Sequence, residues 1–87
     1  MKTNMYTVYD KKAEVYTPPF QAINDEVAQR LMMNCVNNPE HNFGLNPEDY
    51  QLLRIGKFDD QNAHIEAEYI PLCDLITLQR GAKENEE

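Results

Sequence analysis

The feature that most constrains this chain is a single apolar stripe of helical spacing in its first half. Asn24 precedes the stripe with a side chain suited to cap a helix, and two acidic residues follow where the helix dipole favours negative charge. Pro39 disfavours the helical conformation at Asn38, so the helix should end there. We therefore predict one amphipathic helix over residues 25–37, which must cover another apolar surface. The stripe comprises Val27, Ala28, Leu31, Met32, Cys35 and Val36.

A first β-hairpin is predicted before the helix. Residues 5–9, "MYTVY", are rich in aromatic and β-branched side chains, and "DKKAE" follows as a polar turn. Residues 14–17 would form a short or edge strand, because Pro18 and Pro19 lack the N–H groups that a central strand needs.

A second hairpin is predicted after the helix. Residues 50–58, "YQLLRIGKF", lead through the turn "DDQNA" into residues 64–70, whose apolar and polar side chains alternate. Pro71 is expected to end that strand. For residues 72–80, "LCDLITLQR", we favour a short helix, although a continued strand is also compatible with the sequence.

The fold class that follows is α+β: a small antiparallel sheet of two β-hairpins with one main helix packed on one face, in the order β-β-α-β-β plus a short C-terminal element. The length of 87 residues has room for one hydrophobic core. We expect residues 1–80 to form this single domain and residues 81–87 to be a disordered acidic tail.

The segment between helix and second hairpin contains the tripeptide Asn-Pro-Glu twice, beginning at Asn38 and at Asn46. An Asn side chain that caps, followed by a proline and an acid, is typical of a turn or a helix start. We interpret the first copy as a helix stop and the second as one capped helical turn leading into the strand. His41, between them, is interpreted as a solvated loop residue.

Catalytic and metal-binding chemistry find little support. The chain has no serine, no recognisable zinc spacing and no glycine-rich phosphate loop. Its paired carboxylates, such as Asp59 and Asp60, stand in turns where capping explains them. We expect no enzyme activity, no cofactor and no metal site.

The net charge of −7 argues against sequence-independent binding to a phosphate backbone, which depends on Lys and Arg. No segment approaches the length of a membrane span, and no leader is evident at the N-terminus, so we expect a soluble cytoplasmic protein without membrane contact. Cys35 and Cys73 stand in apolar surroundings and are expected to be reduced, buried thiols.

The sheet face away from the helix is the predicted interaction surface. Strand alternation, with Leu53 and Ile55 taken to face the helix, would turn Arg54 and Phe58 outward. Tyr6 and Val8 would point inward. The outward set would also include Leu52, Gly56, Met5, Thr7 and Tyr9, together with Glu66 and Glu68.

Such a face has more than one interpretation. A half-apolar open face often closes a homodimer or receives a second layer. Its aromatic residues could instead stack on single-stranded bases, although the two glutamates would repel phosphates. The residues assigned to possible nucleic-acid or partner contact are Tyr9, Lys11, Lys12, Arg54, Lys57 and Phe58. Solvated surface is the simpler interpretation of each cation alone.

The order of several short motifs resembles a known viral family. They are a "Y-V-Y-D" strand, "P-F-x-A-x-N-D-E-x-A" at the helix start, an "N-N-P" stop, and "P-x-D-Y-x-L-x-R-I-G-x-F-D" before the last hairpin. Together, over residues 6–78, they resemble the small nonstructural protein of gokushoviruses and related microviruses, which are phages with single-stranded DNA genomes.

The resemblance implies a protein that acts in the host bacterial cytoplasm, and members are often labelled DNA-binding. It implies no catalytic or binding residues that can be assigned here. Three hypotheses follow: an accessory protein that modulates viral single-stranded DNA replication or packaging, mainly through contacts with a viral replication, capsid or host protein; a direct single-stranded DNA-binding protein; and an inhibitor of a host defence protein.

Overall fold

The computed structural model describes residues 1–79 of the chain, so the predicted acidic tail lies outside the described residues. The elements in chain order are β1 (Lys2–Asp10), β2 (Val15–Tyr16), β3 (Phe20–Ala22), α1 (Asp25–Val36), α2 (Asn42–Leu45), the 3-10 helix η1 (Pro47–Asp49), β4 (Tyr50–Asp59), β5 (His64–Asp74) and the 3-10 helix η2 (Leu75–Leu78).

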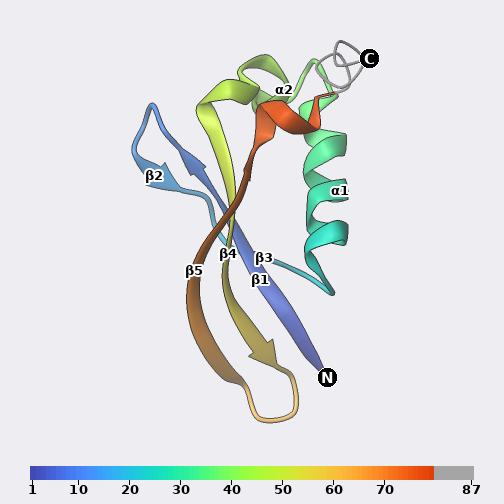
Figure 1. The fold of residues 1–87 in the computed structure, drawn as a ribbon, viewed down its shortest axis with the longest axis vertical. Helices are drawn as coiled ribbons and strands as arrows, with labels where there is room; N and C mark the ends of the chain where they lie inside the picture. The colour runs from blue at the N-terminus through green and yellow to red at the C-terminus, as the bar shows by residue number, and fades with distance from the viewer. Residues whose placement is uncertain (80–87) are drawn as a thin grey trace.

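The strands form one antiparallel sheet in the order β2-β1-β4-β5, and β3 also pairs with β1. Helix α1 lies along one face of this sheet, while the long β4–β5 hairpin extends below it (Figure 1). The predicted α+β fold is therefore confirmed: a small antiparallel sheet with one main helix.

Strand β3 was not predicted. It shares one edge of β1 with β2, and the two prolines at positions 18 and 19 separate the two short strands. Between them Thr17 keeps contact with β1, since its backbone N–H donates to the Val8 carbonyl at 2.9 Å and its Oγ1 accepts from the Val8 N–H at 3.1 Å. The prolines interrupt the pairing without ending it.

Helix α1 begins where the sequence indicates. The Asn24 side chain accepts a hydrogen bond from the Val27 N–H, which satisfies one free donor of the first turn. The helix buries one line of residues, Ala28, Met32 and Val36, against the sheet and η2. Leu31, placed in the buried stripe by its spacing, is 44% exposed. It precedes Met32 by one residue and so lies about 100° around the helix.

The loop after α1 folds back onto the helix end. Gly44 in α2 packs against the Asn38 carbonyl so closely that a Cβ there would collide with it. His41 is no solvated loop residue, because its Nδ1 accepts a hydrogen bond from the Phe43 N–H and its ring contacts the Phe43 ring. The predicted turn before β4 exists as η1, but the Asn46 side chain makes no capping hydrogen bond there.

The chain after Pro71 differs from the prediction. Strand β5 continues through Pro71 to Asp74, and the helical element is limited to η2. Within residues 1–79, β5 pairs with β4 alone, so proline stands on an edge strand where its missing N–H leaves no ladder bond unmade. Leu75 and Leu78 of η2 join the core beside α1.

The sheet has an inner face toward α1 and an outer face away from it. The predicted assignment of residues 52–55 of β4 to these faces was wrong, whereas Gly56 and Phe58 face outward as predicted. Tyr6 and Val8 point inward as expected, and their partners across the ladder are Arg54 and Leu52. Arg54 therefore faces the helix, while Leu53 and Ile55 face outward. Leu52 and Leu53 are adjacent and both apolar, so the sequence does not show which of them faces the helix. Arg54 can point inward because it forms an ion pair with Asp25 there.

The two hairpin turns share one design. Each begins with an aspartate whose side chain accepts a backbone N–H two residues later, at Asp10 and at Asp59. Each ends with a residue in the left-handed region, Glu14 with φ 59° and Ala63 with φ 62°. In both, the N–H of that last residue donates to the carbonyl of the aspartate at 2.8 Å.

This geometry predicts that Ala63→Gly will stabilise the protein. Glycine adopts positive φ without the steric cost that alanine has, so the free energy of unfolding should rise by about 0.5–1 kcal/mol. Urea denaturation measures the change. Ala13→Gly is the matched control in the first hairpin, because Ala13 has no positive φ; an equal gain in the control would contradict the explanation.

Candidate interaction surface

The inner face contains an ion-pair network that joins the sheet to the start of α1. The Asp25 carboxylate accepts hydrogen bonds of 2.6 Å from both the Tyr6 hydroxyl and Arg54 Nη1. Arg54 Nε also donates to Glu68 at 3.2 Å, and the Asn4 side chain donates to the Tyr6 oxygen at 3.0 Å. Arg54 therefore joins the sheet to the helix, and its role in nucleic-acid or partner contact stays a prediction.

The network changes the acidity of its members. Burial by itself would raise the pKa of Asp25, but the hydrogen bonds from Tyr6 and Arg54 outweigh it and hold that pKa below its usual value. Burial, together with the bond to Asp25, raises the pKa of Tyr6 to about 12. The ionised carboxylate and the neutral phenol are thus the forms that the fold stabilises.

The outer face carries aromatic and aliphatic side chains and, along its central strands, no charged one in the described residues. Glu66 lies opposite Lys57, on the inner side with Glu68, so the expected mixture of aromatics and glutamates on one face was wrong. The outward positions are Thr3, Met5, Thr7 and Tyr9 of β1, Tyr16 of β2, Gln21 of β3, Gln51, Leu53, Ile55, Gly56 and Phe58 of β4, and Ile65, Ala67, Tyr69, Pro71 and Asp74 of β5.

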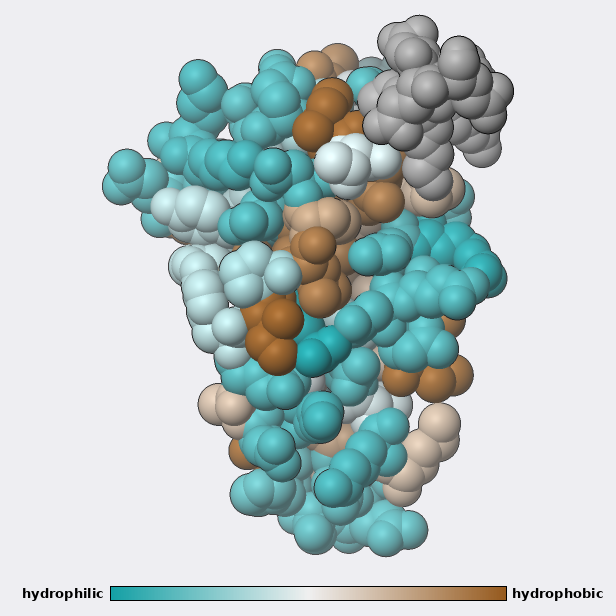
Figure 2. Space-filling view, viewed as in Figure 1, coloured by the Kyte–Doolittle hydropathy of each residue, from teal (hydrophilic) through white to brown (hydrophobic). Residues whose placement is uncertain are grey.

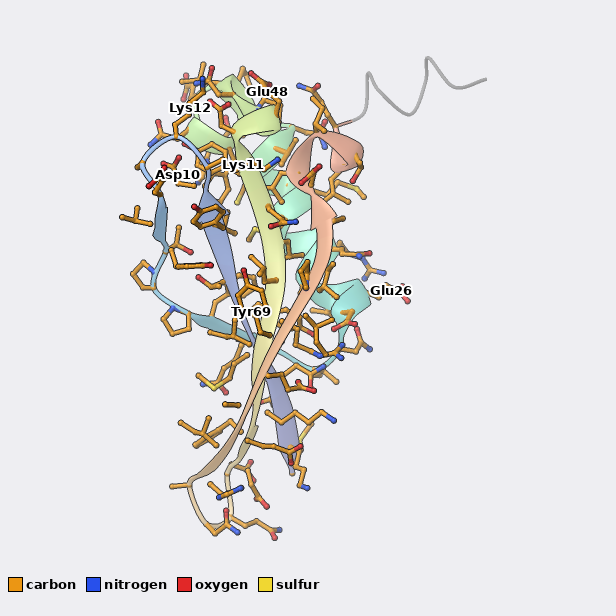
Figure 3. All side chains as sticks on the ribbon, turned by 60° about the vertical axis from the view of Figure 1, so that its left-hand side comes forward. Asp10, Lys11, Lys12, Glu26, Glu48 and Tyr69 are labelled. Atoms are coloured by element: carbon orange, nitrogen blue, oxygen red, sulfur yellow. The ribbon has the colours of Figure 1, made fainter. Side chains whose placement is uncertain are left out.

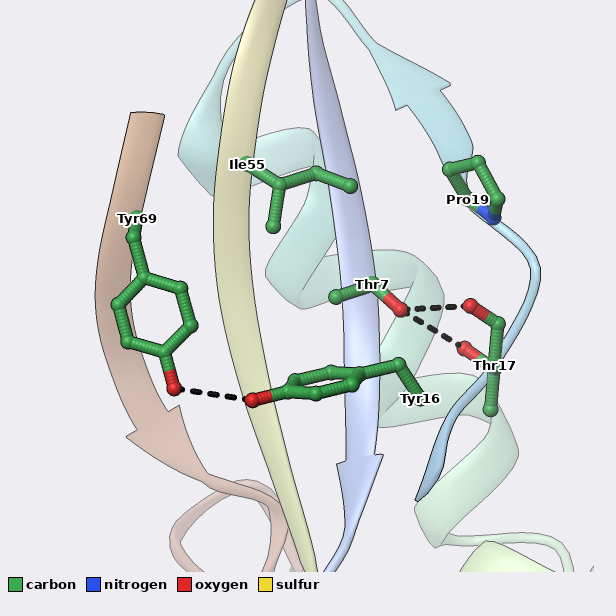
Figure 4. Close-up of a pocket in the computed structure, with 6 residues that line it drawn as sticks. All are labelled: Thr7, Tyr16, Thr17, Pro19, Ile55 and Tyr69. Atoms are coloured by element: carbon green, nitrogen blue, oxygen red, sulfur yellow. Dashed lines mark hydrogen bonds between the residues drawn. The ribbon is translucent and has the colours of Figure 1, made fainter. Parts of the chain in front are cut away.

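Two tyrosines span this face. Tyr16, on the edge strand β2, extends across β1 and β4, and its hydroxyl lies 3.1 Å from the hydroxyl of Tyr69 on β5 (Figure 4). The Tyr9 ring contacts the Tyr16 ring, with centroids 4.7 Å apart. Leu53, at the level of Thr7 beneath this crossing, is fully buried although it faces outward.

A pocket of about 380 Å³ opens beside the tyrosine pair. Its walls are mostly apolar, and its polar lining includes the buried Thr7, whose Oγ1 donates to the Thr17 carbonyl at 2.7 Å. Helix α1 lies behind the sheet in this view, so the pocket belongs to the outer face (Figure 4). The lining residues are Thr7, Tyr16, Thr17, Pro19, Ile55 and Tyr69.

The structure does not bring the six predicted contact residues together. Tyr9 and Phe58 lie on the outer face, while Arg54 and Lys57 lie on the inner side. Lys11 and Lys12 stand at the upper end of the molecule, in the β1–β2 turn near Glu48 (Figure 3). There Lys11 Nζ forms an ion pair with Asp74 at 3.1 Å.

Tyr16 and Tyr69 are the important surface residues that sequence reasoning missed. The signal for Tyr16 was available in the hairpin register, since a turn of residues 11–14 places Tyr9 and Tyr16 opposite each other on one face. No such signal links Tyr16 to Tyr69, because 53 residues separate them and only the strand order brings them together.

Figure 2 shows apolar residues in the middle of one side, where the sheet meets α1, with hydrophilic residues around them.

Cys35 and Cys73 are free thiols, partly rather than fully buried, and burial raises the pKa of Cys73. No helix in the described part of the chain combines the length and hydropathy needed to cross a membrane.

The Asp25 network predicts a specific loss of stability in acid. A carboxyl group whose pKa is lowered by folding contributes stability above its unfolded pKa, and that contribution is lost as the pH falls through the lower, folded value. At neutral pH, Asp25→Asn should reduce the free energy of unfolding by about 2 kcal/mol, because Arg54 loses the closer of its two charged partners. In urea denaturation at a series of pH values below about 4, the variant should show a flatter pH dependence than the wild type.

The matched control is Glu26→Gln. Glu26 adjoins Asp25 but is exposed, and its ion pair with Arg30 at 3.0 Å lies on the helix surface. This variant should keep both the stability and the pH profile of the wild type. If Glu26→Gln flattened the profile as much as Asp25→Asn, the network would not be the source of the pH dependence.

Comparison with known proteins finds one family whose model matches almost the whole chain. The phage ORF5 protein family matches residues 3–80, a span that includes both hairpins, α1 and η2. No curated protein and no solved structure matches the chain. The expected phage origin is confirmed, while the narrower resemblance to gokushoviruses and other microviruses stays a prediction. The chain therefore belongs to the phage ORF5 protein family.

Proposed function

We propose that this chain is a nonstructural phage accessory protein that modulates viral single-stranded DNA replication or packaging, mainly through contacts with other proteins. Membership of a phage family supports the viral setting. The observation that carries the protein-contact mode is the separation of charge from apolar surface. The central strands of the outer face carry no charged side chain, while Lys11, Arg30 and Arg54 are paired with carboxylates.

The cations illustrate why phosphate contact is the weaker hypothesis. Arg54 is held by Asp25 and Glu68, and Arg30 is paired with Glu26 on the surface of α1. A protein that binds a phosphate backbone needs exposed cations that can replace counterions. A net charge of −7 adds long-range repulsion to this local shortage.

The partners that suit this function are a viral replication protein, a capsid protein or a host protein. The proposed location is the host bacterial cytoplasm, where viral DNA is made. The proposed function requires neither catalysis nor a cofactor. Among residues 1–79, no three His, Cys, Asp or Glu side chains gather in a way that could hold a metal ion.

The direct test is deletion of the gene from the phage, with the protein supplied from a plasmid. Deletion should lower the ratio of single-stranded to double-stranded viral DNA, or the number of filled particles. Quantitative PCR with strand-specific primers measures the first, and nuclease-protected DNA the second.

Two controls make this test decisive. Asp25→Asn, which is expected to weaken the fold, should complement less well than Glu26→Gln. Unchanged DNA ratios and packaging in the deletion mutant would overturn the proposal. A growth defect seen only in hosts that carry a defence system would instead indicate the inhibitor of a host defence protein.

Direct single-stranded DNA binding is the second candidate function, and one observation favours it. Tyr9 and Phe58 lie on the outer face, whereas Glu66 and Glu68 lie on the inner side, so the expected repulsion of phosphates does not arise on the aromatic face itself. Aromatic side chains on an open sheet can stack on bases. Lys11 and Lys12, at one end of the molecule, are the nearest candidates for the phosphates.

Fluorescence anisotropy with a labelled oligonucleotide tests this second candidate. We expect a Kd above about 100 μM at low salt, because no cationic track accompanies the aromatic residues. A much tighter Kd, weakened at least tenfold by Tyr9→Ala with Phe58→Ala but not by Leu31→Ala on α1, would favour DNA binding over protein contact. Arg54→Ala is unsuitable as a probe because Arg54 supports the fold.

A further inference from the structure

The outer sheet face exposes several large apolar and aromatic side chains. Tyr69 is 63% exposed, Ile65 55% and Tyr16 49%, and all three lie on this face. Contiguous apolar surface of this kind marks interaction sites in soluble proteins. We propose that a second copy of this chain covers the outer face, giving a homodimer in which two sheets pack face to face. This inference goes beyond the proposed function, since it concerns the purified protein alone.

The charge distribution selects the second copy as the occupant. A basic protein or a nucleic acid would be recognised through complementary charge. The outward strand positions in residues 1–79 offer only Asp74 at the end of β5, and Lys11 already pairs with it at 3.1 Å. Two copies of a chain with net charge −7 repel each other unless their carboxylates remain in solvent. Face-to-face contact meets this condition, because Glu66 and Glu68 lie on the opposite side of each sheet and Asp25 lies on the helix.

The dimensions are sufficient for a stable dimer. The domain measures 44 × 29 × 21 Å along its principal axes, and the sheet extends along the longest of them (Figure 1). A stable interface buries about 800 Å² on each partner, and packed sheets lie about 10 Å apart with interdigitating side chains. A face four strands wide and up to eleven residues long meets the requirement.

The face is also complementary to itself. A twofold contact requires each copy to present both a projecting group and a recess on the same patch. The recess is the apolar pocket beside Tyr16 and Tyr69, bordered by Ile55. The projecting group is Ile65, which lies four residues before Tyr69 on the same side of β5. In the dimer, Ile65 of each copy enters the pocket of the other, and the paired tyrosine hydroxyls remain at its rim.

Sedimentation velocity and light scattering of the purified chain test the proposal. At about 100 μM, the wild type should have twice the monomer mass of 10.2 kDa. Ile65→Glu and Tyr69→Glu each place a charge in the interface and should raise the dimer Kd at least 100-fold. Leu31→Glu is the matched control, because Leu31 is an equally apolar, exposed residue on α1, and this variant should stay dimeric.

A second measurement locates the contact without mutation. Circular dichroism should first establish that each variant is folded. On dilution of the wild type, amide NMR signals should then shift in β1, β4 and β5 and stay unchanged on the exposed side of α1. A wild type that is monomeric at about 100 μM, or a dimer broken by Leu31→Glu and not by Ile65→Glu, would overturn the proposal. So would a monomer whose outer-face signals shift only when an oligonucleotide is added.

Discussion

The ion pair between Arg54 and Asp25 is the interaction on which the rest of the structure depends. It joins the middle of the central strand β4 to the first turn of α1, and the Tyr6 hydroxyl from the neighbouring strand β1 completes it. Three elements from distant parts of the chain therefore meet at one carboxylate. Hydrogen bonds to a charged group are stronger than neutral ones, so this contact holds the first turn of α1 against the sheet. Below it the hairpin extends free of the helix, and above it the apolar line of α1 packs on the core (Figure 1).

The direction of Arg54 also decides the character of the opposite face. Strand side chains alternate, so an inward arginine turns its neighbours Leu53 and Ile55 outward. The same alternation on β5 puts Glu68 inward beside Arg54 and Tyr69 outward. The charges thereby gather on the helix side, where they neutralise each other. What remains outside, apart from Asp74 at the end of β5, is a surface of tyrosines and aliphatic residues with a pocket in it. This surface underlies the proposed dimer.

Much of the fold could be predicted because its signals are local. The cap at Asn24, the spacing of Ala28, Met32 and Val36, and the polar turns of both hairpins each act over a few residues. The errors arose where tertiary contacts override local preference. Pro71 continues a strand because that strand lies at the sheet edge. Leu31 is exposed because the helix buries a narrower line than its apolar residues suggest.

By itself, then, the sequence determined the class of fold, the order of the two hairpins and the main helix, and a family resemblance whose phage setting the family match supports. Only the tertiary structure decided which side chains of β4 face the helix. Leu52 and Leu53 are both apolar and adjacent, so either could have faced it. Only it could bring Tyr16 to Tyr69 across the sheet. The physical reason is the same for both: strand register and the partner of a buried charge depend on contacts between residues far apart in the chain, which no local pattern records.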